Sequence, residues 1–96
     1  MALPSASEPV YDAIARMTVT VLLFASYAEA LGASSLVVEL GGDATVADVV
    51  ANVRARPGAD RVPPTTLVAV NQQYADGASL VRDGDEVALI PPVAGG

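Results

Sequence analysis

The chain has 96 residues, a formal net charge of −6 and an apolar fraction of 52%, which together indicate one small folded domain rather than a disordered chain. Five arginines, no lysine and eleven acidic residues argue against nucleic acid as a partner, because such binding depends on cationic side chains. The lack of cysteine, histidine and lysine removes the thiolate nucleophile, the usual general base and the Schiff-base amine. We therefore expect no metal site and no self-sufficient catalyst.

The N-terminal sixteen residues differ from the rest of the chain. They open with proline, serine and alanine and carry only a weak helical pattern, so we interpret residues 1–16 as a flexible or weakly helical extension and residues 17–96 as the folded domain. They lack the basic start and apolar stretch of a secretion signal. No apolar run approaches the roughly 20 residues that a helix needs to cross a membrane. We expect a cytoplasmic protein without a membrane partner.

The first half of the domain begins with two predicted strands separated by a short helix. Residues 18–25 are β-branched and alternate in polarity, which is typical of a strand, and residues 35–41 form a second such segment. Between them, Ser26 is the expected N-cap of a short helix that Gly32 ends.

The main predicted helix follows over residues 45–56. Thr45 and Asp48 have the spacing of a capping box, and Pro57 with Gly58 should end the helix. One apolar stripe faces the core, formed by Val46, Val49, Val50 and Val53. The preceding glycine turn, residues 41–45, lacks the lysine and the spacing of a phosphate-binding loop, so it reads as a turn with a cap.

The second half reads as strands and turns. After a loop over residues 57–64, we expect a strand at 66–71, a short edge strand near 78–81 and a final strand at 86–91. The acidic stretch around Gly84 is too short for a calcium loop and is interpreted as a turn. The element order predicts an α+β fold, a β-grasp (ubiquitin-like) with a mixed sheet of four to five strands covered by one main helix plus a short helix.

Alternation along the first and last strands predicts an apolar surface. Val19, Val21, Leu23, Val87 and Leu89 supply the core face, so Leu22, Phe24 and Ile90 should lie on the other face. If the two strands are neighbours, these three side chains form an exposed patch of the kind that marks a partner surface. The alternative is that residues 1–16 or the short helix cover them.

The chain ends in "PPVAGG", directly after the last strand. Pro91 and Pro92 lack N–H donors and favour extended backbone, so they should lead the chain away from the sheet. The five residues from Pro92 can reach about 17 Å. Gly95 and Gly96 have no side chains and can enter a channel only a backbone wide. This pattern favours a carrier whose last carboxylate enters a partner's active site.

Three segments, "VLLFAS", "VAVNQ" and "LVRDGDEVALIPPVAGG", resemble the small subunits of molybdopterin synthase in the MoaD/ThiS family of ubiquitin-like sulfur carriers. The resemblance covers about residues 17–96. It implies that the Gly96 carboxylate is adenylated by an E1-like enzyme using ATP and is then thiocarboxylated by a sulfur donor protein. It also implies docking through Phe24 and Ile90, although Ile90 replaces the aromatic residue often found at that position.

The same resemblance implies the later steps. The tail, Pro92, Val93, Ala94 and Gly95, would insert into the synthase large subunit, and sulfur would pass to cyclic pyranopterin monophosphate in a heterotetramer of two small and two large subunits. The carrier itself would hold no permanent cofactor.

Three alternatives remain open from the sequence. The chain could be a sulfur carrier for thiamine thiazole or cysteine synthesis, although thiazole-branch tails tend to lack the double proline. It could be a ubiquitin-like modifier of lysines, or a binding module whose tail has no chemistry. If the native chain extends beyond Gly96, it would need cleavage before any chemistry.

Overall fold

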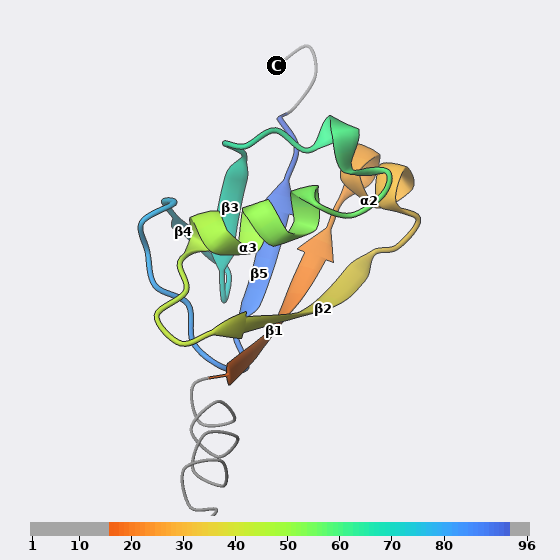
Figure 1. Ribbon diagram of the computed structural model, residues 1–96. Helices are drawn as coiled ribbons and strands as arrows, with labels where there is room; N and C mark the ends of the chain where they lie inside the picture. Colours follow the sequence, from red (N-terminus) through yellow and green to blue (C-terminus); the bar gives the residue numbers. More distant parts are fainter. Residues whose placement is uncertain (1–15, 93–96) are drawn as a thin grey trace, which may run out of the picture.

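A computed structural model describes residues 16–92 and contains a five-stranded sheet with the strand order β2-β1-β5-β3-β4 (Figure 1). The strands are β1 (Arg16–Leu23), β2 (Ser35–Gly41), β3 (Leu67–Val70), β4 (Gln73–Ala75) and β5 (Glu86–Ile90). The helices are α2 (Ala25–Leu31), α3 (Val46–Arg54) and a 3-10 turn, η1 (Ala59–Arg61).

The sheet is mixed because its central pair is parallel. β1 and β5 run in the same direction, with Leu23 beside Leu89, whereas the other neighbouring strands are antiparallel. The predicted β-grasp, with a mixed sheet, one main helix and one short helix, is confirmed. Parallel pairing also places the C-terminal ends of β1 and β5 at the same edge of the sheet, so Phe24 and Pro91 both leave the sheet there.

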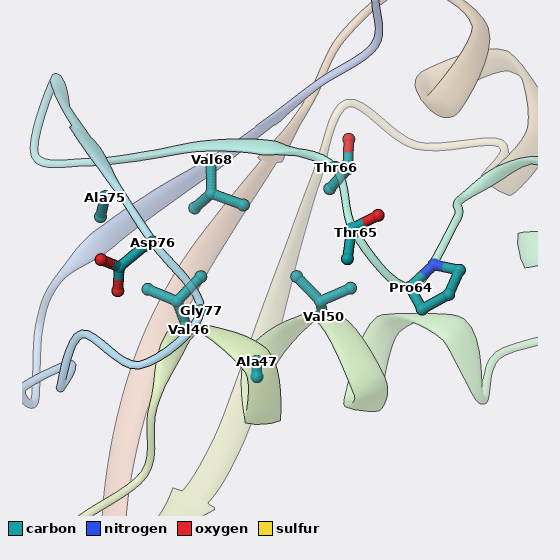
Figure 2. A pocket seen from close by; sticks show the side chains of 10 residues that line it. All are labelled: Val46, Ala47, Val50, Pro64, Thr65, Thr66, Val68, Ala75, Asp76 and Gly77. Carbon is teal, nitrogen blue, oxygen red and sulfur yellow. The ribbon is translucent and has the colours of Figure 1, made fainter.

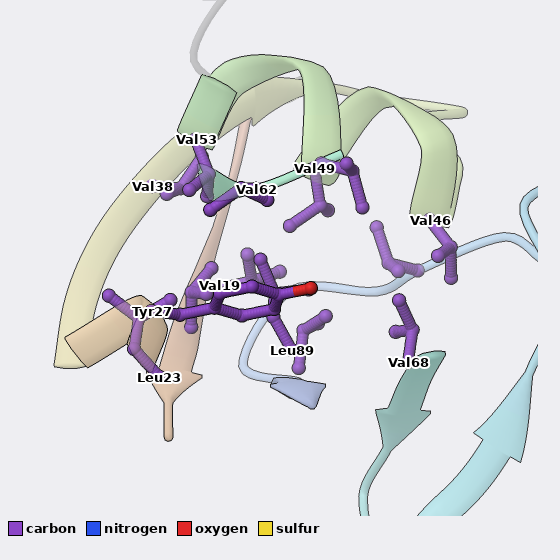
Figure 3. Close-up of a cluster of buried hydrophobic side chains, with 14 of the residues drawn as sticks. Val19, Leu23, Tyr27, Val38, Val46, Val49, Val53, Val62, Val68 and Leu89 are labelled. Atoms are coloured by element: carbon purple, nitrogen blue, oxygen red, sulfur yellow. The ribbon is translucent and has the colours of Figure 1, made fainter. Parts of the chain in front are cut away.

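The core lies between α3 and one face of the sheet. All four valines of the predicted stripe on α3 are buried against Val19, Val21, Leu23, Val38, Val68, Val87 and Leu89. Figure 3 shows Tyr27 reaching from α2 into this cluster. A nine-residue helix is not stable alone in water, so burial of this stripe is what holds α3 in place.

The start of α3 has the predicted capping box. The Asp48 carboxylate accepts the Thr45 N–H at 2.8 Å, and the Thr45 hydroxyl accepts the Asp48 N–H at 3.3 Å. The next two backbone donors bind carbonyls of the segment before β5, which are those of Ser79 and Gly77. These bonds occupy the donors that an anion would need, which agrees with the reading of residues 41–45 as a turn with a cap.

Two helix predictions need correction. Ser26 is not an N-cap, because α2 already begins at Ala25. Phe24 occupies the N-cap position, and its side chain makes no capping hydrogen bond. Gly32 does end α2, in the left-handed conformation that glycine adopts without a steric penalty. The main helix ends at Arg54 rather than at residue 56, and the loop expected after it contains η1.

The predicted edge strand near residues 78–81 is also wrong. Asn71 and Gln72 both have positive φ and form a two-residue hairpin turn, so the chain returns at once and β4 is Gln73–Ala75. Residues 78–81 instead lie against the start of α3, where Leu80 makes only an isolated bridge to Thr45.

Candidate functional site

The sheet face opposite α3 carries the three side chains that alternation assigned to it. Leu22 lies opposite Ala88 across the β1–β5 pair, and Ile90 lies at the end of β5. Phe24 follows the Leu23–Leu89 pair in extended backbone, which places it level with Ile90. The short helix α2 does not cover Phe24, which is 47% exposed. The role of Leu22, Phe24 and Ile90 in docking stays a prediction.

Four further residues belong to the same surface. Leu67 pairs with Ile90, and Ala69 pairs with both Ala88 and Tyr74. Alternation in β3 contains the signal for Leu67, whereas Tyr74 reaches this face only because of the hairpin at Asn71–Gln72. We call this surface the open-face patch; it consists of Leu22, Phe24, Leu67, Ala69, Tyr74, Ala88 and Ile90.

The side chains of the open-face patch differ in size. Ala69 and Ala88, which have small side chains, lie at its centre, and larger side chains surround them. Leu67 and Tyr74 are 48% and 74% exposed, so this apolar area is in contact with water in the isolated chain. A continuous apolar area of this kind on a small acidic domain is typical of a surface that another protein covers.

The tail begins at the edge of this patch. Pro91 is partly buried and Pro92 is exposed, while the predicted tail residues Val93, Ala94, Gly95 and Gly96 lie outside the described residues. Sheet pairing ends at Ile90, because the prolines that follow have no N–H to donate. A partner that covers the open-face patch would therefore meet the chain where it leaves the domain.

The acidic turn before β5 has a structural role. Asp83 accepts the Thr18 N–H at 2.7 Å, and Asp85 accepts the Arg82 N–H at 2.8 Å and the Asn71 amide at 2.9 Å. The Asn71 amide oxygen in turn accepts the Glu86 N–H. Within residues 16–92, no group of three or more carboxylates is arranged to hold a metal ion.

A small groove lies on the helix side of the sheet, between α3 and the segment that enters β3 (Figure 2). Its volume is about 170 Å³, below the roughly 300 Å³ at which ligand pockets usually begin. Asp76, its charged lining residue, already accepts bonds from the Ala78 N–H and the Ser79 hydroxyl. The groove therefore adds no chemistry. In the described part of the chain, no helix has the length and apolar character needed to span a membrane.

Comparison with known proteins gives a consistent result. The model of the ThiS family matches residues 21–96. The molybdopterin synthase sulfur carrier subunit of Chlamydomonas reinhardtii is 40% identical over 83 residues, which cover 83% of this chain and 100% of that protein.

Two solved structures share the fold. The crystal structure of SAMP1 (small archaeal modifier protein 1) from Haloferax volcanii is 32% identical with a TM-score of 0.73, and the match covers 82% of this chain and 99% of that one. A chain from the complex of subunits 1 and 2 of the molybdopterin-converting factor of Helicobacter pylori has a TM-score of 0.60, with coverage of 83% and 100%. Its 22% identity makes this a likeness of fold alone.

Proposed function

Because the chain belongs to the ThiS family, we propose that it is a sulfur carrier protein acting as the small subunit of a molybdopterin synthase. The single observation that carries this proposal is the place where the chain leaves the sheet after β5. The last paired residue of β5, Ile90, is itself part of the open-face patch, so docking and delivery of the carboxyl end use adjoining surfaces. The name of the 40% identical relative supports the choice of pathway.

The proposed chemistry takes place at the Gly96 carboxylate. One carboxylate oxygen attacks the α-phosphorus of ATP on an E1-like adenylating enzyme, and pyrophosphate leaves. Sulfide from a sulfur donor protein then attacks the acyl carbon, AMP leaves, and a thiocarboxylate remains. This activation is needed because a free carboxylate has no good leaving group. The partners supply the catalytic side chains, which agrees with a chain that has no cysteine, histidine or lysine.

The proposed acceptor is the synthase large subunit. The tail residues Pro92, Val93, Ala94 and Gly95 would enter its active site, and sulfur would pass to cyclic pyranopterin monophosphate. We assign the assembly to two small and two large subunits in the cytoplasm. ATP belongs to the adenylating enzyme, and the carrier is proposed to hold no permanent cofactor.

A second candidate is protein modification, favoured by the 32% identity to SAMP1. In that case the activated Gly96 would form an isopeptide bond with a lysine of another protein. The chain has no lysine of its own, so it would not build chains through its own side chains.

The first experiment measures the intact mass of the full chain after incubation with an adenylating enzyme, ATP and a sulfide source. We expect the mass to rise by the difference between one sulfur and one oxygen atom. A variant lacking Gly96 keeps residues 16–92 intact and should show no change. An unchanged mass for the full chain would refute the carrier proposal.

The pathway is decided by a second stage. The thiocarboxylated chain, mixed with a molybdopterin synthase large subunit and the pyranopterin precursor, should give the dithiolene product. Product with a thiazole or cysteine synthase instead would move the chain to a sibling pathway, and lysine conjugates in place of product would support the modifier.

A further inference from the structure

We propose that Thr66 and Tyr27 are positioning residues that set the direction in which the C-terminal tail leaves the domain. They do so by holding the peptide unit that joins Ile90 to Pro91. The inference rests on the proposed function, because a fixed exit direction matters only if the tail must reach a partner's active site.

Two hydrogen bonds in series link α2 to the end of β5. The Thr66 hydroxyl donates to the Ile90 carbonyl oxygen at 3.2 Å, and the Tyr27 and Thr66 hydroxyl oxygens are 2.8 Å apart. Tyr27 is only 2% exposed, so its position is set by the core. The last carbonyl of the sheet is thereby linked to a rigid part of the domain.

The direction of each bond follows from the available protons. A hydroxyl has one proton, and that of Thr66 is given to Ile90. The Tyr27 hydroxyl must therefore donate to the Thr66 oxygen, and this fixes the orientation of the Thr66 hydroxyl. A buried tyrosine hydroxyl also needs a hydrogen-bond partner, so loss of the Thr66 hydroxyl affects both Tyr27 and Ile90.

The restricted backbone dihedrals from Ile90 to Pro92 connect the position of the Ile90 carbonyl to the direction of the tail. The Ile90 carbonyl belongs to the peptide plane that ends at the Pro91 nitrogen, so holding its oxygen restricts ψ of Ile90. The proline ring fixes φ of Pro91, and the following proline restricts ψ of Pro91 to extended values. From Ile90 to Pro92, few rotations remain free, so the Thr66 hydroxyl, together with the Leu67–Ile90 strand pair, restrains the exit direction.

A fixed exit should act on the reaction and not on docking. The open-face patch keeps its side chains whether or not Thr66 has a hydroxyl, so affinity for the adenylating enzyme should be unaffected. Without the bond, the tail leaves over a wider range of directions, and more conformational freedom must be lost to place the carboxylate for attack. The expected effect is on kcat and not on KM.

The test uses the full chain with Thr66→Val, Thr66→Ser, Tyr27→Phe and the double variant Tyr27→Phe/Thr66→Val, which leaves no unpartnered tyrosine hydroxyl. Thr65→Val is the matched control, since Thr65 is exposed and one residue away. In thiocarboxylation assays, Thr66→Val and the double variant should lower kcat roughly three- to tenfold, and Tyr27→Phe should lower kcat less, because Thr66 keeps its bond to Ile90. All three variants should leave KM within about twofold. Thr66→Ser and Thr65→Val should match the unmodified chain.

A second readout does not depend on the reaction. Residual dipolar couplings of the Cα–H bonds of Pro91 and Pro92 should shrink in Thr66→Val relative to those of the sheet, because these bonds then sample more directions. Unchanged couplings, an unchanged kcat, or an equal loss in Thr65→Val would overturn the positioning role. If the unmodified chain is not thiocarboxylated but the couplings shrink as expected, the proposed function fails and the exit geometry stands.

Discussion

At the scale of single residues, two glycines with the same backbone conformation differ in how closely other atoms surround them. Gly58 and Gly84 both have φ of +86°. A Cβ on Gly58 would lie 2.6 Å from the Ala30 carbonyl oxygen, whereas a Cβ on Gly84 would meet nothing within 4 Å. The loop after α3 therefore passes close to the backbone of α2 at Gly58, where a side chain would clash with the Ala30 carbonyl.

We predict that Gly58→Ala lowers the free energy of unfolding by about 2–4 kcal/mol, because it adds a backbone clash to the cost of positive φ. Gly84→Ala should cost only about 1 kcal/mol, the conformational part alone. Urea unfolding followed by circular dichroism measures both. Equal losses in the two variants would show that the approach of Gly58 to α2 contributes nothing.

At the scale of secondary-structure elements, the two helices begin in different ways. α3 starts with a reciprocal capping box between Thr45 and Asp48, whereas the start of α2 has no side-chain cap. Ser26, the residue type usually found at N-caps, lies inside the first turn of α2. The Phe24 carbonyl accepts the backbone N–H groups of Tyr27 and Ala28 there.

We predict that Thr45→Ala lowers the free energy of unfolding by about 1 kcal/mol, since the Asp48 N–H loses its acceptor. Ser26→Ala, the matched change at the other helix, should stay within about 0.5 kcal/mol. The midpoint of urea unfolding measures both changes, provided that the dependence of the unfolding free energy on urea concentration (the m-value) is the same in each variant. A larger loss for Ser26→Ala than for Thr45→Ala would contradict this account of how the helices begin.

At the scale of the whole molecule, the sheet has one face buried against α3 and one face carrying the open-face patch. The exposed aromatic residues of the open-face patch are Phe24, which directly follows β1, and Tyr74 in β4, so they are distant in sequence. Leu80 is exposed to a similar degree, 65%, but it lies beside the start of α3 and away from the patch.

We predict that Phe24→Ala and Tyr74→Ala each weaken binding to a synthase large subunit by about tenfold or more, because buried aromatic side chains dominate interface energies. Leu80→Ala should leave affinity unchanged. Isothermal titration calorimetry gives the dissociation constants, and unfolding curves check that all three variants remain folded. If Leu80→Ala weakens binding as much as the other two, the docking surface is elsewhere.

The sequence by itself determined much of the architecture. The alternation in β1 and β5, the valine stripe on α3 and the Thr45–Asp48 spacing are local patterns, and each depends only on the geometry of one strand or one helix. The same alternation placed Leu22, Phe24 and Ile90 on the face opposite the core, and the "PPVAGG" end marked where the sheet must stop.

Only the tertiary structure decided what depends on residues distant in sequence. The hairpin at Asn71–Gln72 lacks the usual glycine, so the sequence did not show that Tyr74 joins the open-face patch. The cap of α2 was missed because the chain bends at Ala25, with φ of +49°, before the serine is reached. The bonds from Tyr27 through Thr66 to Ile90 join three separate segments, and such contacts exist only after the core has brought those segments together.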